Sequence, residues 1–331
     1  MPAPVSTRFK QTILDSYKLV SKVEVIGPGG QILADSGALN VIGGRINVDA
    51  SASFRRWISD LTLVDSSGLL VPTTAADIFS PVAGNELVLY VGAEVDGVPE
   101  YVKQGVFFLE GCRTEDSPGG LQITLSAYDR GRRYSRGKMI VPKRFLAVNA
   151  TYIYAAITDL LDDVINPTYV LHDSPVYMVP DQVYDAGTDP WETARELAES
   201  MGYELWFDRD GNCRLTQVMD PNSPNLQQHW TYAEGPGSGL LRIIREQSNA
   251  EAYNGQIVYG ENSSNSSPVR DIATDDDINS PTRWGGSYGK VPEFWQSDKI
   301  RTVQQAHAAA VGRLNQRKGL TEVVTFACVP N

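Results

Sequence analysis

The 331-residue chain is poor in the residues that most often build redox, disulfide or metal sites. It has only three cysteines and three histidines. No two cysteines stand at a short paired spacing, which indicates reduced thiols in strands and excludes a disulfide framework or a zinc site of cysteine pairs. The histidines are scattered without a metal-ligand spacing, so we interpret each as a surface or packing residue. These six residues are Cys112, Cys213, Cys328, His172, His229 and His307.

Long apolar runs and an excess of positive charge are also lacking. No window approaches the roughly twenty apolar residues that a membrane helix needs. Residues 1–20 carry several charges and no apolar core of signal-peptide length, so we expect synthesis in a bacterial cytoplasm and no membrane insertion. The net charge of −11 argues against a protein whose main task is to bind nucleic acid, because that affinity comes largely from cationic contacts to phosphate.

Strand patterns dominate what is present. Between residues 42 and 130, five runs alternate apolar and polar residues, and turn residues such as Asp96-Gly97 close them. Such runs give each strand one apolar face, and several of them satisfy their backbone groups only by closing or stacking on one another. The pattern predicts a small antiparallel barrel or sandwich. The runs centre on Ile46–Val48, Leu61–Leu63, Leu87–Val91, Val106–Cys112 and Leu121–Ala127.

The middle of the chain has a different period. Residues 151–164 carry apolar side chains at the spacing of a half-buried helix. Asp189 is placed to cap a second helix, with Pro190 in its first turn and Gly202 at its end. Alternation at Tyr203–Phe207 and around Cys213 then predicts a hairpin. We interpret this part as a compact α+β insert that leans on its neighbours.

The last third restarts strand patterns after a linker at residues 219–228. Residues 261–298 have little periodicity, which predicts a long loop. Because the loop contains several large aromatic residues, we expect it to be ordered by packing against a neighbour. Thr302 with Gln305 predicts a capping box that opens a helix, and residues 322–329 predict a last strand.

The order of short motifs resembles that of tail hub proteins (baseplate hub or tail-tip hub proteins) of tailed bacteriophages. The similarity covers most of the chain and contains no catalytic signature. In the first third it is carried by Gly44-Arg45-Ile46, Val48-Asp49, Arg55-Arg56, Asn85-Glu86-Leu87, Gly105-Val106-Phe107 and Ala127-Tyr128-Asp129-Arg130. Further on it is carried by Asp189-Pro190-Trp191-Glu192, Val258-Tyr259-Gly260, Asp275-Asp276-Asp277 and Val329-Pro330-Asn331.

The resemblance implies an α+β, mainly β fold with two tail-tube-like barrel or sandwich domains separated by a smaller α+β insert. The implied division is an arm at residues 1–20, a first barrel at 21–145, the insert at 146–228 and a second barrel with a long loop and a C-terminal helix at 229–331. It also implies a virion protein at the tail tip, a homotrimer whose six barrels adapt a sixfold tail tube to a threefold spike or fibre. Its expected partners are the distal tail or tail-tube protein, the tape-measure protein and the spike or fibre protein, with DNA passing through the lumen without sequence-specific binding.

Four aromatic residues of the predicted loop are the candidates for an intersubunit anchor, since buried Trp and Tyr dominate such contacts. The alternative is that they cover their own barrel. The four residues are Trp284, Tyr288, Phe294 and Trp295.

No residue is assigned a catalytic, cofactor-binding or metal role. Asp271 with Asp275–Asp277 has the composition of a cation site, but a solvated acidic loop is favoured, and Glu192, Glu196 and Glu199 match any exposed helix face. A run of seven cations between Arg130 and Arg144 is interpreted as a solvated loop or polar subunit contact before a nucleic-acid patch. The alternative functions are a tail-associated cell-wall or polysaccharide hydrolase and a carbohydrate-binding module of the tail.

Overall fold

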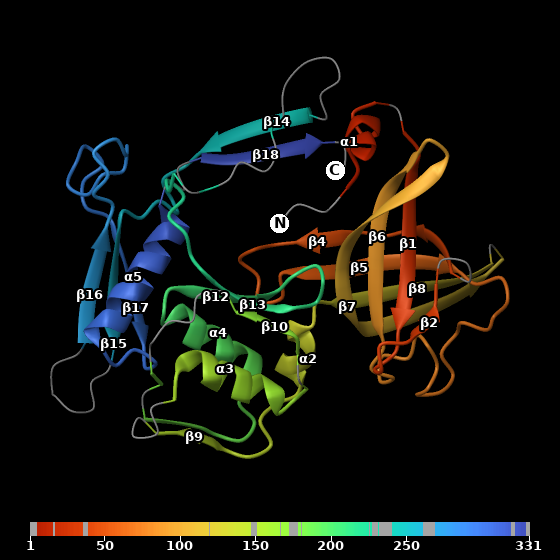
Figure 1. Ribbon diagram of the computed structural model, residues 1–331, viewed down its shortest axis with the longest axis horizontal. Helices are drawn as coiled ribbons and strands as arrows, with labels where there is room; N and C mark the ends of the chain where they lie inside the picture. Colours follow the sequence, from red (N-terminus) through yellow and green to blue (C-terminus); the bar gives the residue numbers. More distant parts are fainter. Residues whose placement is uncertain are drawn as a thin grey trace.

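The chain folds as an α+β, mainly β protein, as predicted. The computed structural model describes residues 5–15, 17–35, 39–118, 120–146, 151–165, 167–171, 178–179, 181–224, 226, 231, 240–260, 269–318 and 322–328. Figure 1 shows a curled sheet at one side, a helical part below the centre and a small sheet with one long helix at the other side. A two-stranded ribbon crosses above them.

The curled sheet contains all five of the predicted runs. Its strands follow the order β2-β1-β6-β7-β8-β5-β3, and β4 also pairs with β5. The Asp96-Gly97 turn between β6 and β7 has positive φ at both residues, as its sequence predicts. The strands are β1 (Leu19–Ile26), β2 (Ile32–Ala34), β3 (Asn40–Gly43), β4 (Ile46–Val48), β5 (Arg56–Val64), β6 (Glu86–Val95), β7 (Val98–Ser117) and β8 (Gly120–Tyr128).

One face of this sheet forms its core, because every second residue of the central strands points to the same side. Leu63, Leu87, Phe107 and Leu125 are fully buried there. The segment between β5 and β6 closes the core with Phe79, which is also fully buried. The β5–β6 connection therefore covers the apolar face of the sheet.

The N-terminal arm contains a helix that the sequence pattern does not predict. Helix α1 (Thr7–Thr12) is capped by the Ser6 hydroxyl, which accepts from the Phe9 N–H at 2.9 Å. Phe9 and Ile13 pack on Ala93 and Val102 of the curled sheet. With only six residues, the helix is too short for periodicity to reveal it.

The helical part contains α2 (Gly131–Arg136), α3 (Ile153–Asp162) and α4 (Pro190–Glu199), in the region where the sequence predicts an insert. Asp189 caps α4 as predicted, accepting from the N–H groups of Trp191 and Glu192. Trp191 and Phe207 stack at 5.2 Å in its core. Its strands are β9 (Lys143–Phe145), β10 (Tyr169–Leu171), β11 (Gln182–Tyr184), β12 (Tyr203–Phe207) and β13 (Cys213–Gln217).

The C-terminal part holds two small sheets. A three-stranded sheet in the order β16-β15-β17 packs on α5 (Val303–Arg317), whose predicted Thr302–Gln305 capping box is present. A two-stranded ribbon joins β14 and β18. The strands are β14 (Leu240–Gln247), β15 (Gly255–Gly260), β16 (Val269–Thr274), β17 (Pro292–Ser297) and β18 (Glu322–Cys328).

The prediction of a loop throughout residues 261–298 is wrong, since β16 and β17 lie within that range. The apolar alternation fails there because the positions facing α5 include charged residues. Asp271 meets His307 at 2.9 Å, and Glu293 meets Arg317 at 3.3 Å. A hydrogen bond to His307 and an ion pair with Arg317 take the place of the apolar side chains that mark a strand in sequence.

A buried acid and its neighbour join the curled sheet to the helical part. Asp129 is 2% exposed, and its carboxylate accepts from the backbone N–H groups of Arg56 at 3.1 Å and Gly131 at 2.9 Å. Arg130 donates twice to Glu86, at 2.8 and 2.7 Å, and once to the Gly211 carbonyl at 2.6 Å. These two consecutive residues therefore end β8, open α2 and tie the hairpin of the helical part to the sheet.

A close backbone contact joins the helical part to α5. A Cβ added at Gly312 would stand 2.6 Å from the Cα atom of Gly202. Gly202 itself has a φ of +74°, which glycine adopts without strain. The turn after α4 and the middle of α5 can approach this closely because neither position carries a side chain.

We predict that Gly312→Ala destabilises the fold by about 1–3 kcal/mol, although alanine is the better helix former, because the added methyl group meets backbone that cannot turn aside. Urea unfolding monitored by circular dichroism measures the change. Gly43→Ala is the control, since nothing lies within 4 Å of its added Cβ. Equal stability of the two variants would contradict the close contact.

The buried Asp129 should make the free energy of unfolding depend on pH. Burial raises the pKa of Asp129 to about 6, so between about pH 4 and pH 6 the folded chain holds this proton more tightly than the unfolded chain. Its contribution to stability is therefore present below about pH 4 and is lost as the pH rises through 6. Urea unfolding of the wild type and Asp129→Asn across this range should show the wild type losing on the order of 1–3 kcal/mol relative to the variant. A constant difference would contradict the assignment.

Candidate assembly surfaces

Two of the four predicted anchor residues lie side by side on β17 and point to opposite faces. Trp295 faces α5, and the Arg313 guanidinium lies 4.6 Å from its ring centroid. Phe294 faces outward and is 61% exposed. Its ring stacks on Tyr259 at a centroid distance of 6.4 Å. Alternation along the strand therefore separates a packing residue from an exposed one.

The other two anchor candidates lie in the turn between β16 and β17 and contact their own sheet. Trp284 lies directly against Gly255, so that an added Cβ there would overlap the indole ring. The Lys290 ammonium lies 5.8 Å from the same ring. The Tyr288 hydroxyl donates to the Ala252 carbonyl at 2.9 Å. Of the four candidates, Phe294 offers the most surface to another chain.

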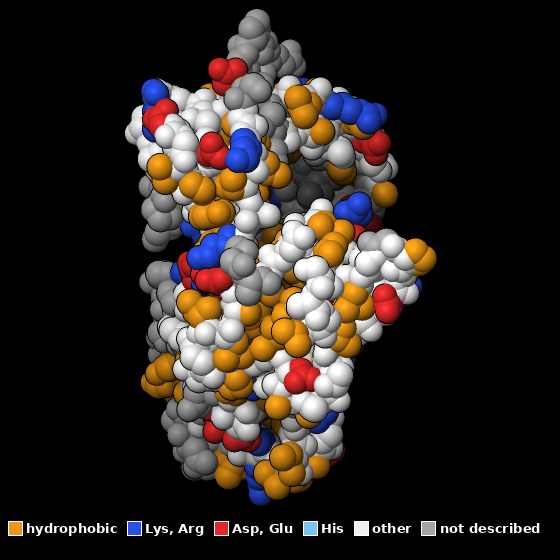
Figure 2. Space-filling model, turned by 90° about the vertical axis from the view of Figure 1, so that its right-hand side faces the viewer, with side chains coloured by type: hydrophobic (Ala, Val, Ile, Leu, Met, Phe, Trp, Pro, Cys, Tyr) orange, Lys and Arg blue, Asp and Glu red, His pale blue; other side chains and the backbone are white. Residues whose placement is uncertain are grey.

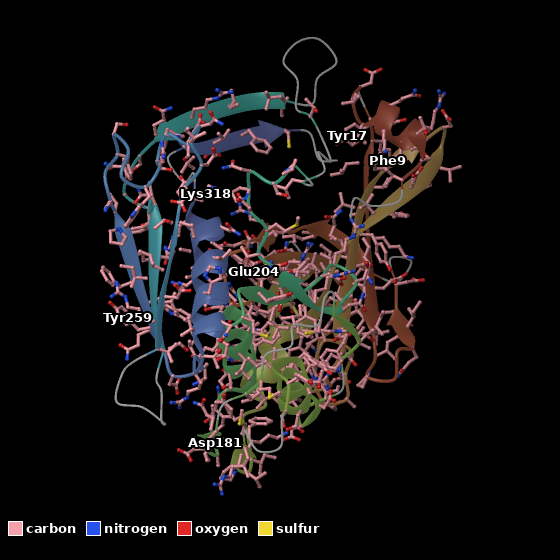
Figure 3. The ribbon with its side chains drawn as sticks, turned by 60° about the vertical axis from the view of Figure 1, so that its left-hand side comes forward. Phe9, Tyr17, Asp181, Glu204, Tyr259 and Lys318 are labelled. Atoms are coloured by element: carbon pink, nitrogen blue, oxygen red, sulfur yellow. The ribbon has the colours of Figure 1, made fainter. Side chains whose placement is uncertain are left out.

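Phe294 belongs to an exposed sheet face. Its register neighbours across the three strands are Ile257 and Ile272, and the Arg270 guanidinium lies 5.6 Å from the Tyr259 ring. Figure 3 shows Tyr259 on the side of this sheet turned away from α5. This face combines an aromatic pair, aliphatic side chains and one cation, a composition that is common in protein–protein contacts.

The β14–β18 ribbon is exposed on both faces. Six of eight positions in β14 and six of seven in β18 are exposed. Leu241, Val323 and Phe326 are among its exposed apolar side chains. The sequence predicts both strands, but alternation alone cannot reveal that no further strand of the described structure covers them.

The aspartates considered as a cation site, Asp271 and Asp275–Asp277, make contacts within the fold. Asp275 is fully buried, and its carboxylate accepts from the hydroxyl groups of Ser280 and Thr282 while Lys318 lies 3.5 Å away. Burial opposes ionisation, but these hydrogen bonds and Lys318 keep the pKa of Asp275 below its usual value. Asp271 pairs with His307 instead. Within the described ranges, no three His, Cys, Asp or Glu residues are grouped to hold a metal ion.

A charged cleft of about 430 Å³ lies where the curled sheet, α4 and α5 meet. Burial raises the pKa of Glu199 against the attraction of Arg195 and Arg313. Glu204, labelled in Figure 3, pairs with Arg55 at 2.7 Å. Each of these carboxylates has an arginine partner, so the cleft has the composition of an ion-pair network between packed elements.

The predicted helix-face carboxylates are divided among different contacts. Glu192 accepts a hydrogen bond from the Ser53 hydroxyl, and Glu196 lies 3.6 Å from the Lys299 ammonium. Glu199 lines the charged cleft. All three also line one open groove beside β17. Arg195 contacts Glu192 and Glu199 there, and Lys299 contacts Glu196, so each carboxylate has a cationic partner.

Most of the cationic run between Arg130 and Arg144 is neutralised within the chain. Arg132 pairs with Glu110 at 2.7 Å, and its guanidinium lowers the pKa of that acid. Lys138 pairs with Asp189, and Lys143 lies within 2.9 Å of two acids, one on α3 and one just after it. Ion-paired cations bind phosphate weakly, which favours a packing role for this run over a nucleic-acid patch.

The cysteines lie in strands, and two of the three histidines lie outside the described ranges. Cys112, Cys213 and Cys328 are free thiols, and each lies in a strand as predicted. His172 and His229 lie outside the described residues. No helix in the described part of the chain has the length and hydropathy needed to cross a bilayer.

The fold is similar to that of two solved tail proteins. The tail protein from Neisseria meningitidis MC58 superposes with a TM-score of 0.56 at 12% identity, over 92% of this chain and 79% of that one. The 43 kDa tail protein of prophage MuSo2 from Shewanella oneidensis superposes with a TM-score of 0.53 at 13% identity, over 92% of this chain and 81% of that one. No protein-family model matches the chain, and no curated protein sequence does.

Paired substitutions on β17 separate packing from association. We predict that Trp295→Ala lowers the free energy of unfolding by about 2–3 kcal/mol, because it removes a ring that packs on the α5 core and on Arg313. Phe294→Ser should change it by about 0.5 kcal/mol or less, since that ring is largely exposed, and should weaken self-association. Urea unfolding and sedimentation velocity measure the two effects. Unchanged association of Phe294→Ser would remove Phe294 from the anchor.

Proposed function

We propose that this chain is a structural subunit of a phage tail tip, a homotrimeric hub ring that adapts a sixfold tail tube to a threefold spike or fibre. The observation that carries the proposal is the tail-protein fold, which extends over 92% of the chain in two solved tail proteins. The motif order of the sequence supports the hub position within the tail. The division into an arm, two β domains and an insert is part of the same proposal.

The architecture suits a symmetry adaptor. The chain has a β-rich body on each side of the helical part (Figure 1). Three copies related by a threefold axis would place six such bodies in a ring, which can meet a sixfold tube on one side and a threefold partner on the other. The helical part fixes the spacing of the two bodies through the Asp129–Arg130 junction and the Gly202–Gly312 contact.

The net charge suits a DNA conduit. A chain with a net charge of −11 forms a ring whose overall field repels phosphate, so DNA can pass without being held. Most of the cationic run is already paired with acids of the same chain.

On the face shown in Figure 2, hydrophobic side chains gather near the middle and charges of both signs are scattered around them, a mixture typical of protein contacts.

A tail-associated hydrolase is the main alternative. It needs an acid and a partner base, or a metal, facing an open cleft. In the charged cleft each carboxylate pairs with arginine, and the described residues group no metal ligands. A carbohydrate-binding module finds support in the stacked pair of Phe294 and Tyr259, of which Phe294 is exposed. The structural role is therefore favoured, with the tape-measure, distal tail and spike or fibre proteins as its neighbours.

Native mass spectrometry of the purified chain tests the proposal. We expect a species of three times the 36.3 kDa subunit mass, and negative-stain images of that species should show a ring with a central passage. Peptidoglycan and polysaccharide turnover by the same sample should equal the buffer blank. A monomer at all concentrations, or hydrolysis that Glu199→Gln abolishes, would overturn the hub assignment.

A further inference from the structure

One edge of the three-stranded sheet, the outer edge of β17, has no strand partner. The order β16-β15-β17 pairs β17 with β15 on one side and, in the part of the chain that the structure describes, with no strand on the other (left of Figure 1). Alternate residues of such an edge strand point their backbone N–H and C=O groups away from the sheet. Another chain can pair with these groups by adding a strand.

The β17 edge lacks the usual protection of a free edge. Bulges and charged side chains commonly protect such edges, because an open row of backbone groups also permits unwanted pairing. The β15–β17 register contains no bulge, and residues 294–297 carry no charged side chain. Glu293, near the start of the strand, is paired with Arg317 of α5. The edge is therefore open to a partner strand.

An open groove of about 640 Å³ borders this edge, and α4 forms its opposite wall. On the β17 side the groove is lined by the four consecutive residues 295–298. Consecutive residues of a strand point to opposite faces of a sheet. The groove therefore borders the backbone edge of β17 and not one face of the sheet, which is where an added strand would lie.

The exposed part of the groove is acidic, because the cations that contact its acids lie deeper. The Lys299 side chain is 9% exposed, whereas the Glu196 side chain that it contacts is 56% exposed. Arg195 is likewise less exposed than Glu192, with side-chain exposures of 22% and 43%. A ligand in the groove therefore meets mainly carboxylates. The lining acids are Glu192, Glu196, Glu199 and Asp298.

We propose that β17 is the docking site for an extended, basic segment of another tail protein, which adds to the sheet as a fourth strand. Lys or Arg side chains on one face of that segment meet the acids of α4, and their aliphatic stems pack against Trp295, which also lines the groove. This inference deepens the proposed function and rests on it for the source of the segment, a neighbouring protein of the tail.

The charges favour a different chain over a second copy of this one. Like charges across an interface cost free energy, whereas opposite charges speed association and select the partner. A second copy has a net charge of −11 and would bring more negative charge to an acidic groove. At about 3.3 Å per residue, the six residues of β17 give an edge roughly 20 Å long, so about six extended residues fill it.

Peptide binding to the full chain tests the site. The probe is an acetylated and amidated octapeptide of alternating Lys and Val, and isothermal titration calorimetry measures its affinity. It should bind at least about tenfold more tightly than the octapeptide of alternating Glu and Val. A Lys–Val peptide methylated at every backbone nitrogen keeps the charge but loses the backbone donors, so it should also bind at least about tenfold more weakly. Equal binding of the methylated peptide would overturn strand addition.

Hydrogen–deuterium exchange locates the bound probe. The Lys–Val peptide should slow exchange in residues 292–297, because new strand hydrogen bonds protect the outward-pointing amides. β16 is the control, since it is the opposite edge of the same sheet and does not line the groove. Protection of both edges alike, or of neither, contradicts the proposed site.

Substitution tests the role of the acids. The double variant Glu192→Gln with Glu196→Gln should weaken binding of the Lys–Val peptide by about three- to tenfold, because it removes two charges that face the groove. Glu115→Gln is the matched control, since it removes an exposed acid of β7 and should change binding less than about twofold. The thermal unfolding midpoint reports whether each variant is folded. Equal affinity of the double variant and the wild type would remove the acids from the site.

The outcomes separate this inference from the hub proposal. A trimeric ring that binds no Lys–Val peptide overturns the docking site and leaves the hub assignment standing. A chain that is monomeric at every concentration but binds the peptide along β17 overturns the hub assignment and supports strand addition. A trimer that binds the peptide with protection of β17 supports both.

Discussion

The buried carboxylate of Asp129 and the adjacent Arg130 guanidinium are the constraint on which the arrangement of the chain depends. The Asp129 carboxylate accepts hydrogen bonds from backbone N–H groups of the sheet and of the start of α2. Arg130 satisfies Glu86 and a carbonyl of the β12–β13 hairpin. A buried charge is costly unless it is paired and hydrogen-bonded, so these groups hold the sheet and the helical part in one orientation.

From that joint outward, the contacts become more polar. Trp191 and Phe207 fill the helical part, whereas α4 and α5 meet through arginine and glutamate side chains around the charged cleft and through the Gly202–Gly312 contact. The ribbon beyond α5 has little cover in the described structure. A subunit with a firm centre and incompletely covered extremities is what an assembly component requires, because the uncovered surfaces are available to neighbouring chains.

The anchor prediction shows how far residue type alone can be taken. Trp284, Tyr288 and Trp295 are candidates because large aromatic residues dominate interfaces, but in the fold each contacts its own sheet or helix. Phe294, one position from Trp295, is the exposed member of the set. Consecutive residues of a strand point to opposite faces of the sheet. What an aromatic side chain contacts therefore depends on strand pairing and register, which composition does not encode.

The sequence by itself determined five of the eight strands of the curled sheet, β4 to β8, together with the Asp96-Gly97 turn, the Asp189 cap and the Thr302–Gln305 capping box. Each of these depends on residues close together in the chain. It could not determine β16 and β17, since their inward positions include Asp271 and Glu293, which become acceptable only against His307 and Arg317 of α5. Nor could it find α1 or the exposure of the β14–β18 ribbon. Those features depend on which distant segments meet, and only the tertiary structure decides which faces stay uncovered.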